Sequence, residues 1–436
     1  MGTLIDWYDF YIYGSLATIL AAQFFPSANL LLSFLAAVGV FGVGFAVRPF
    51  GALLFGWMGD KFGRKVTFMI TILGMGVSTF LIGLLPTAAQ VGVFAGVLLA
   101  ILRIIQGLSL GGEYGGAVIY VSEHAPDNKR GYYTSWIQTT ATVGFFLAIA
   151  AILVTRLQIG SSNFSDWGWR IPFLASAFLL ALGVYLRFKF RETPLFNYIK
   201  QKAQLSKNPL RESFGKNWKP IALALFGAVA GEGVVWYTGQ FWLLYYLQNV
   251  AKVDFITSNL VLLIALAAGT PFFILFGWLS DRIGRKKIML LGNLLAAVTY
   301  VPIFIGISYG ASTGNIALMA LLGWLLVVYV TMVYAPIAAY LVELFPTRIR
   351  YTSLSFPYHI GNGWFGGFVP FIATALILTF GGVVYGTKGE VLSISNPYVA
   401  LAYPIAVALM TSIIMALFVK ETKGTKIWSE IQQISA

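Results

Sequence analysis

Residues 56–65 read GWMGDKFGRK, and residues 277–286 read GWLSDRIGRK. The two stretches share the pattern G-W-x-x-D-x-x-G-R-K and begin 221 residues apart, at positions 56 and 277. Each is a polar, basic block directly after an apolar segment. A match of this length and separation predicts a chain built from two halves of like organisation.

Two further matches occur in the same order. The pattern E-x-x-P-x-x-x-R occupies residues 123–130 and returns at residues 343–350. The triplet RET at 191–193 is matched by KET at 420–422. Three ordered matches at a nearly constant offset are not expected by chance. They predict two helix bundles of the same topology, which is the parallel-repeat arrangement of one class of secondary transporters.

The composition is that of a membrane protein. Hydrophobic residues make up 58% of the 436 residues and charged residues only 10%, whereas soluble domains carry about 25% charged residues. So little charge excludes a soluble enzyme, a nucleic-acid-binding protein and a disordered chain. The chain has no cysteine and two histidines, which argues against disulfides and against a metal site. We therefore expect no metal, no other cofactor and no nucleic-acid partner.

Twelve segments are long and apolar enough to span a bilayer, which takes roughly 20 residues in a helix. Their approximate extents are 4–25, 30–57, 67–86, 91–122, 131–156, 169–189, 219–248, 255–279, 287–309, 315–341, 353–380 and 396–419. Because the repeat divides them equally, we expect an all-α polytopic membrane protein with twelve transmembrane helices in two six-helix bundles. A monomer is the expected state of this fold.

The distribution of basic residues predicts the orientation. With both termini in the cytoplasm, 23 of the 29 Lys and Arg residues lie on the inner side, as the positive-inside rule demands. We therefore expect a multi-pass protein of the plasma (inner) membrane, and no cleavable signal peptide. The predicted parts are an N-terminal bundle at 1–190, a cytoplasmic linker at 191–218, a C-terminal bundle at 219–420 and a cytoplasmic tail at 421–436.

The repeated block resembles the signature loop of the major facilitator superfamily. More narrowly, five motifs resemble the metabolite:H+ symporter family, and they are DWYDFYIYG at 6–14, RPFG at 48–51, GGEYGG at 111–116, WGWRIPF at 167–173 and VWYTGQF at 235–241. The resemblance covers essentially the whole chain. It implies alternating access, coupling to protons, and a substrate that is an organic acid or a zwitterionic osmolyte.

The charged ends of the repeat are a candidate cytoplasmic latch. A carboxylate such as Asp60 can meet a helix N-terminus or an arginine of a neighbouring span. The resemblance implies that these clusters close the cytoplasmic side in one conformation and separate in another. The alternative is surface charge that only sets the topology. The candidate latch residues are Asp60, Arg64, Glu123, Arg130, Asp281, Arg285, Glu343 and Arg350.

Charged residues inside the spans are functional candidates, because a charge at a helix centre costs roughly 2.5–3.5 kcal/mol. Asp9 and Arg103 rank first, since the resemblance implies that the span-1 aspartate meets the span-4 arginine. Protonation of Asp9 would then free Arg103 for a substrate carboxylate and couple the two fluxes. A permanent structural ion pair is the alternative. Glu113 is a second candidate proton carrier or a gate, and the alternative is a carboxylate that caps a helix or pairs with loop arginines.

Arg48 is a candidate contact for an anionic group, because its guanidinium fork matches a carboxylate. Its alternative is a side chain that reaches the outer headgroups. In the second half, Glu232 is a candidate partner for an amine, and Trp236 and Gln240 follow it turn by turn on one face. The full set of candidate substrate contacts is Arg48, Arg103, Tyr13, Gln106, Glu232, Trp236, Tyr237, Gln240, Tyr358 and Asn362.

The expected function is proton-coupled symport of a small organic acid, either a mono-, di- or tricarboxylate or an aromatic acid, by alternating access. Proton-coupled symport of zwitterions such as betaine or proline is the nearest alternative. A membrane sensor that binds without transport, and a channel, are alternatives of another class. An enzyme is not expected, because the sequence offers no set of nucleophile, base and orienting group.

Overall fold

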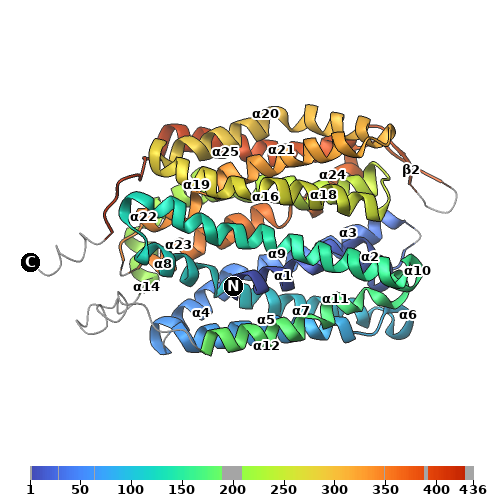
Figure 1. Ribbon diagram of the computed structural model, residues 1–436, viewed down its shortest axis with the longest axis horizontal. Helices are drawn as coiled ribbons and strands as arrows, with labels where there is room; N and C mark the ends of the chain where they lie inside the picture. Colours follow the sequence, from blue (N-terminus) through green and yellow to red (C-terminus); the bar gives the residue numbers. More distant parts are fainter. Residues whose placement is uncertain are drawn as a thin grey trace, which may run out of the picture.

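The computed structural model describes residues 2–27, 29–62, 64–188, 209–347, 349–386 and 391–427, and the side chains at 59–68, 186–188 and 209 lie outside this description. Within these ranges the chain is almost entirely helical, and most helices run along the long axis of the molecule (Figure 1). The predicted all-α class is confirmed.

The first half of the described chain contains twelve of the labelled α-helices and one short π-helix. Their bounds are α1 Gly2–Ser15, α2 Ala17–Phe24, α3 Leu30–Ala46, α4 Arg48–Phe62, α5 Arg64–Leu84, α6 Ala88–Val91, α7 Phe94–Gly111, α8 Tyr114–His124, α9 Arg130–Ile159, α10 Ser161–Asn163, the π-helix Phe164–Gly168, α11 Arg170–Leu174 and α12 Ser176–Phe188. A 3-10 turn at Asp127–Lys129 precedes α9.

The second half is also helical, and its first described element is the short helix α14. Its α-helices are α14 Pro209–Lys216, α15 Trp218–Ala224, α16 Ala230–Tyr237, α17 Leu243–Tyr245, α18 Phe255–Gly269, α19 Pro271–Ile283, α20 Arg285–Ser312, α21 Ile316–Tyr334, α22 Ile337–Leu344, α23 Arg350–Ile360, α24 Val369–Phe380 and α25 Ala402–Phe418. The π-helical turns are Leu225–Val229, Thr238–Trp242, Tyr246–Val250 and Gly361–Gly366, and a 3-10 turn spans Pro397–Leu401. A small antiparallel hairpin pairs β1 Val383–Tyr385 with β2 Val391–Ile394.

Each of the twelve predicted segments is helical in the described part of the chain. By length and composition, nine helical stretches there can cross a membrane, or ten if the bent pair Ser161–Gly168 and Arg170–Tyr185 forms one span. Met69–Leu84 is apolar but shorter, and the first segment is divided at Leu16 between α1 and α2. The polytopic membrane fold is therefore confirmed, and the count of twelve spans stays a prediction.

The burial pattern is the reverse of that in a soluble protein. Large apolar side chains such as Phe178, Val298 and Leu417 are 70–74% exposed, while Arg48 and Arg103 are fully buried. Apolar groups on the outside and charged groups in the interior suit a lipid-facing surface around a polar centre.

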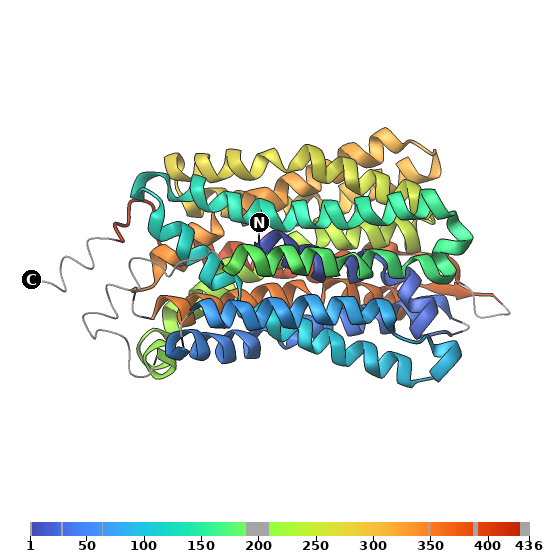
Figure 2. The same ribbon diagram turned by 60° about the horizontal axis from the view of Figure 1, so that its bottom comes forward.

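Helices of the same half pack chiefly on one another. In the first half, α7 lies against α3, α4 and α5, and in the second half α20 lies against α21 and α25. Figure 1 shows these groups on opposite sides of the molecule, and Figure 2 shows the same helices from another side. The halves meet along two seams, where α9 packs against α18 and α19, and where α3 and α4 pack against α23 and α24.

Close approach between α3 and α7 depends on glycine. A Cβ on Gly107 would overlap the backbone carbonyl of Gly44, so any larger residue would push these helices apart. A Cβ on Gly44 would stand 2.9 Å from Nη2 of Arg103. The absence of a side chain at Gly44 thus provides room for a buried guanidinium group.

Candidate functional site

Arg48, the first residue of α4, lies on the seam between the two halves. Its side chain is fully buried, and its Nε donates a hydrogen bond of 3.2 Å to Nδ1 of His359 on α23. Among the described residues, neither Nη atom has a hydrogen-bond partner. Burial excludes the alternative in which Arg48 reaches the outer headgroups. The free fork has the geometry that binds a carboxylate.

Glu232 on α16 is the matching acidic group in the second half. It is fully buried, and its Oε2 accepts a hydrogen bond of 2.7 Å from Nδ2 of Asn362. Its Oε1 has no partner within the part of the chain that the structure describes. Arg48 lies close enough for its charge to act on Glu232, yet these two described residues form no ion pair. Two buried groups that can carry opposite charges thus lie near one another without forming an ion pair.

A row of stacked rings lies beside this charge pair. The ring centroids of Trp7 and Tyr11 are 4.9 Å apart, and those of Tyr11 and Trp236 are 5.1 Å apart. Trp7 also lies 5.7 Å from the guanidinium carbon of Arg48, and Trp236 is one helical turn after Glu232. We call Trp7, Tyr11 and Trp236 the aromatic ladder. Ring faces attract cations, including quaternary ammonium groups.

The structure brings other predicted contacts to the same place. The ring of Tyr358 lies 6.0 Å from the guanidinium carbon of Arg48, and Asn362 holds Glu232. Tyr237 and Gln240 are buried next to Trp236 on span 7, and within the described ranges neither amide atom of Gln240 has a hydrogen-bond partner. Candidates from both halves of the sequence therefore converge on one buried polar centre.

Sequence reasoning missed a polar network between the two halves. The Nε2 of Gln138 donates to the hydroxyl of Tyr114 at 2.9 Å and to the backbone carbonyl of Tyr334 at 3.1 Å. The hydroxyls of Tyr334 and Tyr358 are 2.8 Å apart. Nothing in the sequence singles out Gln138. The missed members of the aromatic ladder did carry a signal, because Trp7 and Tyr11 are four residues apart and share a helix face.

The expected pairing of Arg103 with Asp9 is wrong in this structure. The Nη1 of Arg103 donates instead to Oε1 of Gln106 at 2.8 Å, and Gln106 donates to the hydroxyl of Thr79 at 2.7 Å. All four of these residues are buried. The hydrogen bonds from Arg103 to Gln106 and from Gln106 to Thr79 thus connect α7 with α5 inside the first half.

Aromatic rings of α1 occupy the place beside Arg103 that the sequence assigns to Asp9. The guanidinium carbon of Arg103 lies 4.2 Å from the ring centroid of Phe10 and 4.6 Å from that of Tyr13. The hydroxyl of Tyr13 donates to the carbonyl of Ala37 at 2.9 Å. The rings of Phe10 and Tyr13, and not the carboxyl group of Asp9, therefore contact the guanidinium group of Arg103.

Asp9 lies near the other predicted proton carrier instead. It is 1% exposed, and within the described residues its Oδ1 has no hydrogen-bond partner. Glu113 lies close enough for its charge to act on Asp9. Glu113 stands at the break between α7 and α8, where the carbonyl of Gly112 accepts a hydrogen bond of 2.8 Å from Tyr351 on α23. Two buried carboxyl groups therefore lie together beside a contact between the halves.

Asp281, at the end of α19, binds the start of a helix in the other half. Its carboxylate accepts from the backbone N–H groups of Gly131 and Tyr132 on α9, at 2.9 and 2.8 Å. Arg285 binds the same carboxylate at 2.7 Å. A carboxylate is favourable at a helix N-terminus, where the backbone N–H groups lack helical partners.

Glu343 gathers partners from both halves. Its Oε1 binds Nη1 of Arg130 at 2.8 Å and Nη2 of Arg285 at 3.1 Å, and its Oε2 accepts from the hydroxyl of Thr422 at 2.7 Å. The side chains of Glu343 and Arg130 are completely buried. The cluster lies across the seam between α9 and α19, and its predicted members are Arg130, Asp281, Arg285 and Glu343.

The other four predicted latch residues lie elsewhere or outside the description. The Nε of Arg350 donates to the carbonyls of Val342 and Phe345, at 3.0 and 2.9 Å. These carbonyl groups at the end of α22 thereby gain a hydrogen-bond donor. Glu123 is buried at the end of α8. The side chains of Asp60 and Arg64 lie outside the described residues.

The predicted C-terminal tail takes part in the cluster. Glu421 accepts from the backbone N–H groups of Arg285 and Lys286, at 2.9 and 3.1 Å, and so caps α20. A few residues later, the carbonyl of Thr425 accepts from Arg130 at 3.1 Å. The tail therefore contacts the second half first and then the first half.

The halves also meet at the opposite end of the molecule. The hydroxyl of Tyr245 donates to the carbonyl of Gly14 at 2.6 Å, and the hydroxyl of Thr18 donates to Oε1 of Gln248 at 2.8 Å. Contacts at both ends leave the polar centre around Arg48 enclosed, as its full burial also shows.

Comparisons with known proteins agree with this architecture. A family model described as sugar (and other) transporter matches residues 1–433. The proline/betaine transporter of Escherichia coli (strain K12) is 35% identical over 390 residues, which cover 86% of this chain and 76% of that protein. The shikimate transporter of the same strain is 34% identical over 388 residues, covering 87% of each chain.

The fold is also that of a solved transporter. The proton:xylose symporter of the major facilitator superfamily superposes with a TM-score of 0.73 at 19% identity, covering 99% of this chain and 96% of that one. The family consists of transporters and not of enzymes. This chain is a multi-pass membrane transporter of the major facilitator fold, and it belongs to the sugar (and other) transporter family.

Proposed function

We propose that this protein is a proton-coupled symporter of a small zwitterion, such as proline or a betaine, working by alternating access. The observation that carries the proposal is the pair of buried, opposite charges on the seam. Arg48 offers two nitrogens and Glu232 one oxygen that have no partner among the described residues. Buried charges without partners are costly. A ligand with the complementary charges would supply the missing partners of both Arg48 and Glu232.

The chemistry of the centre suits an amino acid or a betaine. Arg48 can hold a carboxylate through two parallel N–H···O bonds. Glu232 can hold an ammonium group, while the aromatic ladder can hold a quaternary ammonium group that has no N–H to donate. One centre can thus bind both ends of a zwitterion.

The relatives favour a zwitterion over an organic acid as the substrate. From the sequence alone, organic acids rank before zwitterions. The relative with 35% identity is named a proline/betaine transporter, which favours the zwitterion. Organic acids stay the second candidate, because the shikimate transporter is 34% identical and Arg48 offers the same fork to any carboxylate.

Asp9 is the proposed proton carrier, with Glu113 beside it. A carboxylate that is buried without a cationic partner is costly, so Asp9 is neutralised by a proton in the enclosed conformation. When the centre opens to water, solvation stabilises the carboxylate form of Asp9, and the proton leaves. The pH gradient would supply about 1.4 kcal/mol per pH unit.

Alternating access follows from the contacts at the two ends. The latch cluster of Arg130, Asp281, Arg285 and Glu343 would separate when the centre opens to the cytoplasm, while the Tyr245 and Thr18 contacts would separate when it opens outward. This proposal places both termini in the cytoplasm of a bacterial inner-membrane protein. It also keeps bundles at 1–190 and 219–420, and a monomer as the transporting unit.

Uptake into proteoliposomes tests the proposal. Labelled proline, glycine betaine, shikimate and a simple dicarboxylate would be offered with and without an inward proton gradient. The account predicts accumulation of a zwitterion that collapses with a protonophore. Accumulation of acids alone would favour the second candidate, and saturable binding without any uptake would favour a sensor.

A further inference from the structure

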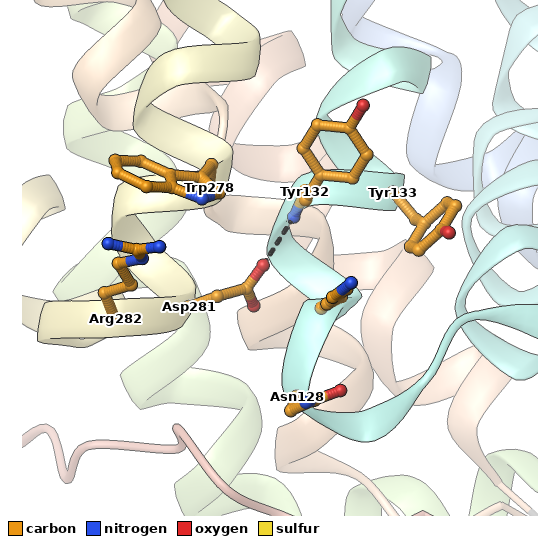
Figure 3. A pocket seen from close by; sticks show the side chains of 7 residues that line it. Asn128, Tyr132, Tyr133, Trp278, Asp281 and Arg282 are labelled. Carbon is orange, nitrogen blue, oxygen red and sulfur yellow. Dashed lines mark hydrogen bonds between the residues drawn. The ribbon is translucent and has the colours of Figure 1, made fainter.

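A groove lies between the start of α9 and the end of α19, on the seam that holds the latch cluster (Figure 3). Its cavity volume is about 590 Å³. Asn128, Lys129, Tyr132 and Tyr133 line it from the first half, and Trp278, Asp281 and Arg282 line it from the second. Neither the proposed substrate centre nor the proposed proton path uses this groove.

The groove carries a positive charge. Within the described residues, neither Lys129 nor Arg282 takes part in an ion pair. The carboxylate that lines the groove, Asp281, is already bound by Arg285 at 2.7 Å and by two backbone N–H groups of α9. The neighbouring Asp127 is bound to the first arginine of α9. The two cations are therefore available to an external anion.

The Arg282 side chain is held in place by a ring. Its guanidinium carbon lies 3.9 Å from the ring centroid of Trp278. Figure 3 shows these two side chains on one wall of the groove, with Tyr132, Tyr133 and Asn128 on the other. A guanidinium stacked on a ring keeps its in-plane N–H groups free, and these match the oxygen atoms of a phosphate.

The surroundings of the groove are those of a membrane interface. Trp136, Tyr133 and Trp278 are 54%, 41% and 39% exposed, and Leu275, one turn from Trp278, is 44% exposed. Tryptophan and tyrosine gather at the headgroup level of bilayers. Basic pockets between transmembrane helices bind acidic headgroups. An anion that reaches this groove can thus be part of a lipid.

We propose that this groove binds the phosphate of an acidic phospholipid, with the acyl chains along the exposed apolar faces of α9 and α19. Lys129 comes from one half and Arg282 from the other, so one phosphate can contact both only while the latch is closed. A ligand favours the conformation that it binds more tightly. The lipid therefore stabilises the closed cytoplasmic side. This inference depends on the membrane location of the chain and not on which substrate it transports.

Native mass spectrometry of the purified full-length protein, titrated with phosphatidylglycerol, tests the site. The double variant Lys129→Gln/Arg282→Gln is expected to lose roughly 25-fold in affinity for one bound lipid, at about fivefold for each charge. The matched control is Lys219→Gln, whose Nζ lies 5.7 Å over the ring of Trp218 but outside the groove. This control is expected to bind as the wild type does.

Two further arms identify the ligand and guard against misfolding. Phosphatidylcholine and inorganic phosphate are each expected to bind at least tenfold more weakly than phosphatidylglycerol. If the double variant does not fold, the single variant Lys129→Gln, which removes an exposed side chain, is expected to lose about fivefold. Unchanged binding in the groove variants, an equal loss in Lys219→Gln, or equal binding of inorganic phosphate would overturn the proposal.

Discussion

Arg130 and Glu343, which belong to different halves of the chain, form an ion pair of 2.8 Å in which neither side chain is exposed. Removing one partner of a buried pair costs about 3–5 kcal/mol. Glu343→Gln should therefore open the cytoplasmic side more often. Because the chain has no cysteine, a single Ser135→Cys on the buried face of α9 can report opening through its rate of maleimide labelling.

Labelling in the Glu343→Gln background should rise at least tenfold, since each 1.4 kcal/mol is a factor of ten in the equilibrium. Lys287→Gln removes an exposed charge from α20 and serves as the control. Equal labelling rates in the two variants would show that the Arg130–Glu343 pair does not hold the seam closed.

Arg48 and Arg103 should respond differently to the same substitution. Arg48→Lys replaces a planar fork with a single ammonium group, and the lost charged hydrogen bond is worth about 1.5–3 kcal/mol. The KM for substrate should rise about tenfold to a hundredfold in uptake assays. Arg103→Lys should lower the thermal unfolding midpoint but leave KM within about twofold, because Arg103 contacts Gln106 and aromatic rings of its own half. A similar rise in KM for both variants would contradict this assignment.

Much of the fold can be predicted from the sequence, because its evidence is local. Apolar segments, charge asymmetry and the repeated block each depend on neighbouring residues. The partners in the site are not local. Arg48 meets His359 across 311 residues, and Glu232 meets Asn362 across 130. The sequence does not reveal that Arg103 packs against the rings of Phe10 and Tyr13 and binds Gln106 instead of Asp9, because these contacts depend on how the helices pack together.

Glu232→Gln keeps the shape of the side chain and removes its charge. Binding of a zwitterion should weaken about tenfold or more, in line with the loss of a charged hydrogen bond of about 1.5–3 kcal/mol. An acid without a cationic group should be unaffected, which makes a competing dicarboxylate the internal control. Tryptophan fluorescence titration can measure both. If zwitterion affinity were unchanged, Glu232 would not be the ammonium contact.

Asp9→Asn should separate transport from accumulation. A neutral amide at this position cannot release a proton, so the variant should exchange labelled for unlabelled substrate but not concentrate it. Counterflow and gradient-driven uptake in the same proteoliposomes distinguish the two activities. Asp166→Asn, which changes an exposed carboxylate, is the control and should accumulate normally. Full accumulation by Asp9→Asn would require a different proton carrier.

The most direct test of the central claim is the current that substrate evokes in proteoliposomes on a solid-supported membrane. A zwitterion carries no net charge, so its transport with a proton moves one positive charge inward, whereas a monocarboxylate with one proton moves none. The account predicts an inward current with proline or a betaine that disappears in Asp9→Asn. Uptake of these zwitterions without any current, or current only with acids, would contradict it.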